Sequence, residues 1–366
     1  MTILVVNAGS SSLRLAAFRS GSELELLAAD HLRTPAEAEP DVVREFVGRH
    51  RLDPLRAVVH RVVHGGARFH RPVRIDAEVE AEIERLCALA PLHNPMALAW
   101  IRAARAALPA GTAEMAAFDT AFYAELPEVA RAYALPEALC RQHGIRRYGF
   151  HGLAHQSMLE AWTAAGGAAD ARVISLQLGS GCSITASRGG RPLDTSMGFS
   201  PLEGLMMATR SGDLDPSVVL HLLEHGGFDV AGLAELLNRR SGLLGVSGVA
   251  SSMSTLIEST DPAAKRAVDL FCHRARKYLG AYLAVLGGVD AVLFGGGIGE
   301  HAPLIRARVL EDFEWAGIVI DPDANRRLTS GGGPIHHPDS RVAVRVVAVD
   351  EMSLMARAAR ALLTAS

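Results

Sequence analysis

Five polar residues could act together on a phosphate group. Asn7, Asp119 and Glu351 each follow a short apolar run, Arg61 lies inside one, and Arg210 lies in a loop of small residues. Taken singly, each could be a helix cap or one half of an ion pair. Taken together they suit phosphoryl transfer, in which a metal ion neutralises phosphate oxygens and fixed cations stabilise the in-line transition state.

Two distant segments share a strand, a Gly-Ser turn and a returning strand. They are Val5–Ser10 followed by Leu13–Phe18, and Leu176–Ser180 followed by Ile184–Ala186. One such hairpin is an ordinary surface turn. Two with an amide side chain at the same offset before Gly-Ser favour a duplicated lobe, in which each turn offers N–H groups and hydroxyls to a shared anion, although two unrelated turns remain the alternative.

Several common sites are excluded or poorly supported. The chain has no GxxxxGK[ST] segment, which excludes a P-loop, and Gly295–Gly299 lacks the GxGxxG spacing of a dinucleotide fold. We interpret these glycines first as a place of close backbone packing. The pairs His60/His64 and His151/His155 have i, i+4 spacing, but the first lies in a predicted strand, so we do not predict zinc.

The elements that position these residues alternate along the chain. Short apolar runs between longer stretches of helical spacing predict a layered α/β architecture. Helices are expected at 77–89, 97–108, 218–223 and 263–286, and Asp215-Pro216 is a start signal for the third. In such sheets ligands gather at strand ends. The predicted buried strands are Ile3–Val6, Ala57–Val63, Glu114–Phe118, Val173–Leu178, Ala291–Phe294 and Val342–Val349.

Composition narrows the class of protein. A length of 366 residues suggests two domains or one large lobed domain, and 37 Lys+Arg against 40 Asp+Glu argue against a nucleic-acid partner. Four scattered cysteines and a first apolar run too short for a secretory signal favour a reduced, cytoplasmic protein. The most apolar stretch, 278–299, is interrupted by Asp290 and several glycines, so we expect a helix end, turn, strand and glycine loop there, and no membrane span.

Motifs along nearly the whole chain resemble those of the acetate kinase family, the acetate/propionate kinases of the actin and sugar-kinase superfamily. The resemblance implies an α/β fold of two ribonuclease H-like lobes around a central cleft, and usually a homodimer. We expect the first lobe to contain residues 1–120 plus 353–366 and the second to contain residues 121–352. The motifs are, in order, 7–13, 60–66, 91–95, 118–122, 148–152, 195–199, 201–204, 209–212, 245–248 and 297–300.

The resemblance also implies a role for the polar residues at the strand ends. Asn7 and Glu351 would hold Mg²⁺, with Mn²⁺ as the alternative. Arg61 and Arg210 would bind the substrate carboxylate and the transferring phosphoryl group, and His151 would stabilise the transition state. A guanidinium fork matches the geometry of carboxylate and phosphoryl oxygens, so the chemistry agrees with these roles.

On the acceptor side, Asp119 would orient or deprotonate the carboxylic substrate. Because a carboxylate is already ionised near neutral pH, we favour an orienting or metal-linked role. Val63, Leu92, Phe150 and Pro201 match the small apolar acyl pocket of the family. Val63 favours acetate over propionate, but one methylene discriminates by only about 1–3 kcal/mol, so we expect overlapping use of both acids.

The departures from the family lie on the donor side. Arg14 stands where the family has Lys, Gln177 where it has His, Ser180 and His301 where it has Asn, and Ser252–Ser254 where it has charged nucleoside contacts. We expect ATP as donor and ADP as product. Pyrophosphate or another nucleotide is the alternative, and a catalytically silent sensor of acetyl phosphate or nucleotide is a third hypothesis. The predicted donor site comprises Arg14, Gln177, Leu178, Gly179, Ser180, Gly181, Ser252, Met253, Ser254, Gly297, Ile298, Gly299, Glu300 and His301.

Overall fold

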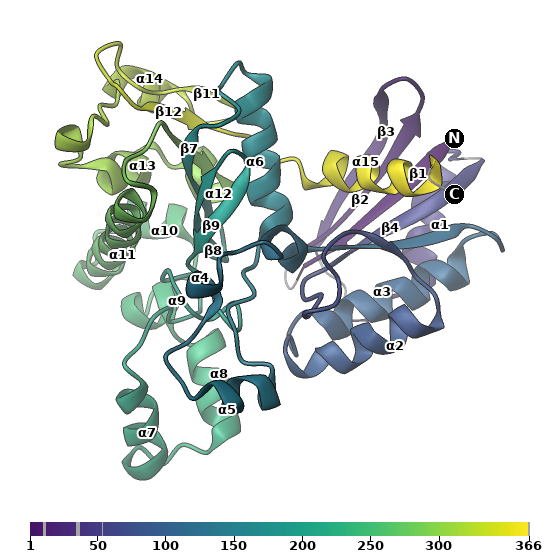
Figure 1. Cartoon of the computed structure of the whole chain (residues 1–366), viewed down its shortest axis with the longest axis horizontal. Helices are drawn as coiled ribbons and strands as arrows, with labels where there is room; N and C mark the ends of the chain where they lie inside the picture. Colours follow the sequence, from purple (N-terminus) through teal and green to yellow (C-terminus); the bar gives the residue numbers. More distant parts are fainter. Residues whose placement is uncertain (10–11, 34–36, 53, 365–366) are drawn as a thin grey trace. The chain divides into compact units, whose positions relative to one another are not determined.

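The computed structural model describes residues 1–9, 12–33, 37–52 and 54–364. The chain forms two compact units: unit 1 contains residues 1–124, 150–153 and 350 onward, and unit 2 contains residues 125–149 and 154–349. Ser10 and Ser11, at the tip of the first predicted hairpin, lie outside the described residues. Figure 1 labels most of the helices and strands of both units.

Unit 1 is built on a six-stranded sheet with the order β3-β2-β1-β4-β6-β5. β1, β4 and β6 are parallel, whereas β2, β3 and β5 are antiparallel to their neighbours. Every residue of β1 is buried because helices α1 and α3 pack on one face and α15 on the other. The elements are β1 (Thr2–Ala8), β2 (Ser12–Ser20), β3 (Leu24–Arg33), α1 (Pro40–Arg49), β4 (Leu55–Val62), β5 (Val73–Arg74), α2 (Ala77–Arg85), η1 (Leu86–Ala88), α3 (Asn94–Ala107), β6 (Ala113–Phe118), η2 (Asp119–Tyr123) and α15 (Glu351–Thr364).

Unit 2 contains a second six-stranded sheet, with the order β11-β12-β10-β7-β8-β9. β7, β10 and β12 are parallel, and the 25-residue helix α11 packs along β8 and β9. The elements are α4 (Glu128–Arg131), α5 (Glu137–His143), α6 (Gly152–Ala164), β7 (Arg172–Leu178), β8 (Cys182–Arg188), β9 (Arg191–Thr195), α7 (Pro216–His225), α8 (Val230–Arg239), α9 (Gly242–Ser247), α10 (Met253–Glu258), α11 (Pro262–Leu286), β10 (Ala291–Gly295), α12 (Gly296–His301), α13 (Pro303–Leu310), η3 (Glu314–Ala316), α14 (Pro322–Arg327), β11 (Gly333–Pro334) and β12 (Ala343–Val346).

The two sheets repeat one topology. Replacing β1 to β6 by β7 to β12 converts one strand order into the other, and each sheet begins with an antiparallel hairpin, β1-β2 or β7-β8. In each hairpin turn a glycine N–H donates to a backbone oxygen, from Gly9 to Ser12 at 2.8 Å and from Gly179 to Gly181 at 3.0 Å. The duplicated lobe predicted from the Gly-Ser segments is confirmed.

The expected lobe boundaries differ from the compact units. Residues 121–124, 150–153 and 350–352 were expected in the second lobe, but in the structure they belong to unit 1. The reason is that η2 continues directly from β6, while α15 begins at Glu351 and packs its apolar residues against β1 and β4. Glu351 is thereby brought into the same unit as Asn7.

Most predicted elements are present with shifted ends. The predicted helix 77–89 ends as α2 at Arg85 and continues as the 3-10 turn η1, and the strand expected at 342–349 is shorter, because the chain leaves β12 after Val346 on its way to α15. The stretch 278–299 contains the end of α11, a turn and β10, as predicted, but the glycine run begins the short helix α12 and is not the predicted loop. No described helix combines the length and apolar character needed to cross a membrane.

Two buried histidines should make the fold sensitive to acid. Burial, aided by Arg105, lowers the pKa of His60 in β4 to about 3, and burial lowers the pKa of His155 in α6 to about 3. Both are neutral when folded and regain a pKa near 6.5 when unfolded. Their contribution to the free energy of unfolding is fully present above pH 6.5. It is lost as the pH falls toward 3, at roughly 1.4 kcal/mol per pH unit for each histidine.

We therefore expect His60→Leu to reduce the acid sensitivity. Neither ring nitrogen of His60 has a hydrogen-bond partner among the described residues, so leucine leaves no polar group stranded. Between about pH 7 and about pH 4.5, the free energy of unfolding of the variant, measured with urea, should fall by roughly 2–3 kcal/mol less than that of the native chain. Equal falls in the two proteins would contradict the prediction.

Candidate active site

Four of the predicted polar residues meet in unit 1. Arg61 Nε and Nη2 donate to the two carboxylate oxygens of Asp119, at 3.1 and 2.6 Å. Arg61 Nη1 donates to Asn7 Oδ1 at 3.3 Å, and Asn7 Nδ2 donates to Glu351 Oε2 at 2.7 Å. Asn7, Arg61 and Asp119 come from the carboxyl ends of the parallel strands β1, β4 and β6, which is why residues far apart in sequence form one chain of contacts.

The charges of this cluster depend on one another. Asp119 is completely buried, and burial raises the pKa of its carboxyl, although Arg61 and the His151 backbone N–H stabilise the charged form. Burial alone would lower the pKa of Arg61, but Asp119 and Glu351 outweigh it and raise that pKa, so the guanidinium stays charged. A bidentate arginine is therefore held by a carboxylate that has no water around it.

His151 contacts this cluster through its backbone N–H, which stabilises the Asp119 carboxylate, and its backbone conformation is unusual. It has a positive φ of 58°, a conformation uncommon for a residue with a side chain, and the next residue is Gly152. A Cβ on Gly152 would overlap the Asp119 carbonyl oxygen, so only glycine fits there. Tyr123 Oη donates to the Phe150 carbonyl at 3.0 Å and anchors the same segment. The 150–153 segment is thus fixed against η2, which carries Asp119.

Three residues of the predicted acyl pocket belong to unit 1. Val63 and Phe150 are buried and Leu92 is half-buried. His64 contacts Phe150 edge to face, with ring centroids 5.5 Å apart, and its backbone N–H and carbonyl are both bonded to the side chain of Asn94, at 3.1 and 3.0 Å. The chain after β4 is therefore held in one conformation. The fourth predicted residue, Pro201, is in unit 2.

Unit 2 contains a pocket of about 500 Å³ beside the second hairpin. Eight predicted donor-site residues line it: Gly179, Ser180, Ser252, Met253, Ser254, Gly297, Ile298 and His301. Sequence reasoning missed Ser251, Ile257, Glu258 and residues 302–304, which also line it. Of the remaining predicted residues, Gln177, Leu178, Gly181, Gly299 and Glu300 flank the pocket without lining it, and Arg14 is exposed on β2 in unit 1.

The glycine run after β10 serves close packing and an open surface together. Gly296 has φ 75°, and a Cβ there would lie 2.6 Å from the Leu178 carbonyl oxygen, so the predicted backbone packing is confirmed at this residue. A Cβ on Gly297 would meet nothing within 4 Å, and Gly297 lines the pocket. Beside the run, Gln177 Oε1 is buried and has no hydrogen-bond partner among the described residues.

The polar groups of the pocket are mainly hydroxyls. Ser252 Oγ and Ser254 Oγ are 2.8 Å apart at the start of α10, and the residue between them in the sequence is the uncharged Met253. His301 Nδ1 donates to the Thr329 carbonyl at 2.6 Å, and Glu300 Oε1 accepts from the Gly331 N–H at 2.8 Å. His301 and Glu300 therefore join α12 to the loop between α14 and β11.

Arg306 is a structural residue of this region that sequence reasoning missed. Its fully buried guanidinium makes five hydrogen bonds, to the carbonyls of Gly299, Glu300, Asn325 and Leu328 and to the Asn325 side chain, at 2.6–2.9 Å. Burial lowers the pKa of Arg306 to about 10. Arg306 joins the end of α12 to α14, but nothing in the sequence of α13 (Pro303–Leu310) distinguishes it from Arg308 two residues later.

Arg210 lies in unit 2, in a loop held by backbone contacts. Its Nη1 donates to the Pro201 carbonyl at 3.2 Å and contacts Met207 Sδ at 3.7 Å. Burial lowers the pKa of Arg210. The Met207 N–H donates to the Arg210 carbonyl at 3.1 Å, and the Ala208 N–H donates to the Ser180 carbonyl at 3.1 Å. The arginine loop is thereby attached to the second hairpin within unit 2.

Comparison with known proteins places these geometries among carboxylate kinases. Residues 28–357 match the model of the acetokinase family. The acetate kinase of Rhodopseudomonas palustris is 42% identical over 97% of this chain and 96% of its own, and that of Clavibacter michiganensis is 45% identical over 92% and 85%. Among solved structures, the acetate kinase of Porphyromonas gingivalis (36% identity, TM-score 0.89) covers 99% of both chains, and a propionate kinase of Francisella tularensis (34%, 0.87) covers 98%.

Arg306 should contribute far more to stability than its neighbour Arg308. Replacing Arg306 by Met leaves buried carbonyl oxygens without donors, and we expect a loss of about 3 kcal/mol or more in the free energy of unfolding. Arg308 is on the same helix and pairs with the exposed Asp269 at 2.7 Å, so Arg308→Met should cost under about 1 kcal/mol. Urea unfolding curves of both variants test this, and similar losses would refute it.

Proposed function

Because the chain belongs to the acetokinase family, we propose that it is an acetate kinase, which transfers a phosphoryl group reversibly between ATP and acetate to give acetyl phosphate and ADP. The observation that supports this most is the buried Arg61–Asp119 pair, linked through Asn7 to Glu351 at the carboxyl ends of three parallel strands. The reaction would use residues of both units.

Arg61 would bind the acceptor. Its contacts with Asp119 and Asn7 use three of the five N–H groups of the guanidinium, which leaves two for a carboxylate or phosphoryl oxygen. An acetate oxygen would attack the γ-phosphorus while the bond to the β,γ-bridging oxygen breaks and ADP leaves with the electron pair. No proton has to be removed from an ionised acetate, so Asp119 would act by orienting Arg61.

Asn7 and Glu351 suit a magnesium ion. Both supply hard oxygen ligands, and Mg²⁺ in such enzymes binds through one or two carboxylates while sharing the substrate phosphates. Mn²⁺ accepts the same ligands. When bound, the metal would neutralise charge on the phosphate oxygens of the donor. Arg210 and His151 would stabilise the charge of the transferring group, for which two positive or hydrogen-bonding groups suit its equatorial oxygens.

The unit 2 pocket supports a nucleotide as donor. Its apolar lining residues, among them Met253, Ile257 and Ile298, suit the faces of a base, and pyrophosphate has no group that would use them. Ser252 and Ser254 supply hydroxyls where charged groups would bind a nucleoside more tightly. The second candidate is therefore the same acyl phosphate chemistry with another donor, and propionate as a second acceptor.

We also propose that the protein is a cytoplasmic homodimer, and the exposed helix α7 supports the dimer. None of the residues of α7 is buried, and Leu220 and Val218 are 58% and 39% exposed. A helix with so much apolar surface is more stable when covered, and we propose that a second copy covers it.

Leu220→Glu should then convert a species of twice the chain mass, measured by sedimentation, into one of single mass. A native chain of single mass would exclude the dimer.

Turnover should require Arg210. The purified protein is expected to form acetyl hydroxamate from acetate, ATP, Mg²⁺ and hydroxylamine, and Arg210→Ala should abolish product while the circular dichroism spectrum is unchanged. Absence of product with every donor tested would reject the kinase assignment, and calorimetric binding without turnover would support a sensor instead.

A panel of donors should favour nucleotides. With acetate saturating, we expect ATP to give a saturable rate and pyrophosphate to give little product, since only a nucleotide fills the pocket beside α10. The reverse order would reassign the donor, while leaving the acyl phosphate chemistry intact.

A further inference from the structure

A closed loop follows β9 in unit 2. Its first residue, Ser196, is paired with Ile184 of β8 by two hydrogen bonds, of 3.0 and 3.1 Å. Its last residue, Gly204, has φ 102°, and a Cβ there would lie 2.6 Å from the Ser196 carbonyl oxygen. The two ends of this 196–204 loop therefore touch, and only glycine permits the approach.

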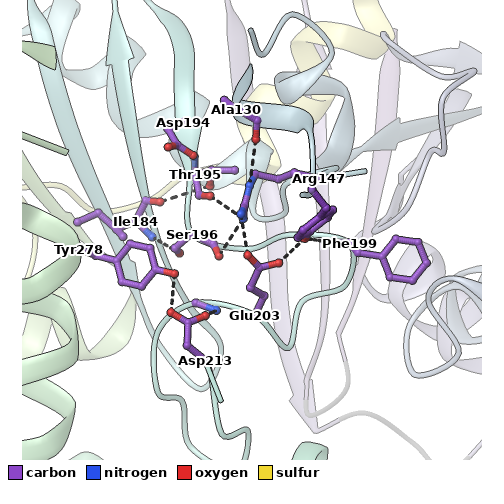
Figure 2. Close-up of polar contacts among 12 residues, drawn as sticks. Ala130, Arg147, Ile184, Asp194, Thr195, Ser196, Phe199, Glu203, Asp213 and Tyr278 are labelled. Atoms are coloured by element: carbon purple, nitrogen blue, oxygen red, sulfur yellow. Dashed lines mark hydrogen bonds and ion pairs between the residues drawn. The ribbon is translucent and has the colours of Figure 1, made fainter. Parts of the chain in front are cut away.

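The Glu203 carboxylate lies between Arg147 and Tyr133, and Figure 2 shows its contact with Arg147. Arg147 Nη2 donates to Glu203 Oε1 at 2.6 Å, and Tyr133 Oη donates to Glu203 Oε2. Burial, together with Glu203, raises the pKa of Tyr133, so the phenol keeps its proton. A Cβ on Gly198 would overlap both Glu203 and Tyr133, which explains the glycine.

The same two partners of Glu203 also hold the backbone of the loop. Arg147 Nη1 donates to the carbonyls of Thr195 and Ser196 at 3.1 and 3.3 Å. The Phe199 N–H donates to Tyr133 Oη at 2.8 Å. The start, middle and end of the loop are thus connected through three side chains, Arg147, Glu203 and Tyr133, which we call the loop cluster.

The loop leads directly to Arg210. The Pro201 carbonyl accepts from Arg210 Nη1 at 3.2 Å, so the position of residue 201 limits where that guanidinium can point. Asp213 closes the other side: its Oδ1 accepts from the Gly204 N–H at 2.7 Å and its Oδ2 from Tyr278 Oη at 2.7 Å. Glu203 is next to Gly204, which bonds to Asp213, and two residues from Pro201, which bonds to Arg210.

We propose that Arg147, Glu203 and Tyr133 are positioning residues for phosphoryl transfer, which act through the 196–204 loop and the Pro201 carbonyl to aim Arg210. The inference rests on the proposed function, because the role of Arg210 is part of it. A misplacement of about 1 Å at a transition-state contact can cost about 10²-fold in rate, so loosening the loop should lower kcat although none of the three side chains touches substrate.

The first test separates kcat from KM. For Glu203→Gln and Tyr133→Phe we expect kcat to fall about 10–100-fold, with the KM for ATP changed less than about twofold. The control is Asp290→Asn, which breaks another arginine pair of unit 2, with Arg172 at 2.7 Å, at the opposite end of β7 from the hairpin turn. Asp290→Asn should lower the melting temperature and leave kcat unchanged. A loss of stability with unchanged kcat in the loop-cluster variants would overturn the proposal.

The second test asks whether the cluster acts through Arg210. If it does, Glu203→Gln should lower kcat much less in an Arg210→Lys background than in the native chain. Equal fold-losses in both backgrounds would place the effect elsewhere and reject the inference. If the native protein makes no acyl phosphate with any donor, the proposed function fails instead, so the two failures are distinguishable.

Discussion

The Arg61 guanidinium is paired with the fully buried Asp119 carboxylate at the carboxyl end of the first sheet, and the charge of Asp119 alone would be strongly disfavoured there. Their bidentate contact needs β4 and β6 side by side, η2 starting exactly after β6, and Gly152 against the Asp119 carbonyl. The charge attraction and the two hydrogen bonds within the pair offset the free-energy cost of burying it. They also fix the direction of the remaining N–H groups of Arg61. The strand order of unit 1 is therefore a requirement of the chemistry.

In unit 2, backbone atoms rather than carboxylates hold the arginine side chains and shape the pocket. The glycines at 179, 296 and 297 place N–H groups and open surface beside one another, and Arg306 joins the short helix α12 to α14 through neutral acceptors. Arg210 is likewise held by a neutral acceptor, the Pro201 carbonyl. A carbonyl oxygen holds this guanidinium group without neutralising its charge, which suits the proposed role of Arg210 toward an anionic substrate.

The sequence was sufficient for the parts of the fold that depend on local pattern. Buried runs predicted β1, β4, β6, β7 and β10, and the predicted Asp215-Pro216 start matches the observed cap of α7. Asn7, Arg61 and Asp119 were predictable as a group because each lies at or next to the carboxyl end of a strand. Glu351 was predicted from a strand end at 349, but it is the first residue of α15. The loop cluster was not predictable, since Arg147 and Glu203 are 56 residues apart and nothing in either segment indicates that they pair. Arg306 was missed because four of its five hydrogen bonds go to backbone carbonyls, which do not depend on residue type.

The acetate KM of Asp119→Asn tests the central claim most directly, namely that the buried pair exists to hold Arg61 toward the acceptor. An amide keeps one acceptor oxygen but loses the charge, so the account predicts a rise in the acetate KM of about tenfold or more, equivalent to about 1.4 kcal/mol, with measurable turnover at saturating acetate. An unchanged acetate KM with turnover abolished would contradict it, and would make Asp119 a participant in the chemical step.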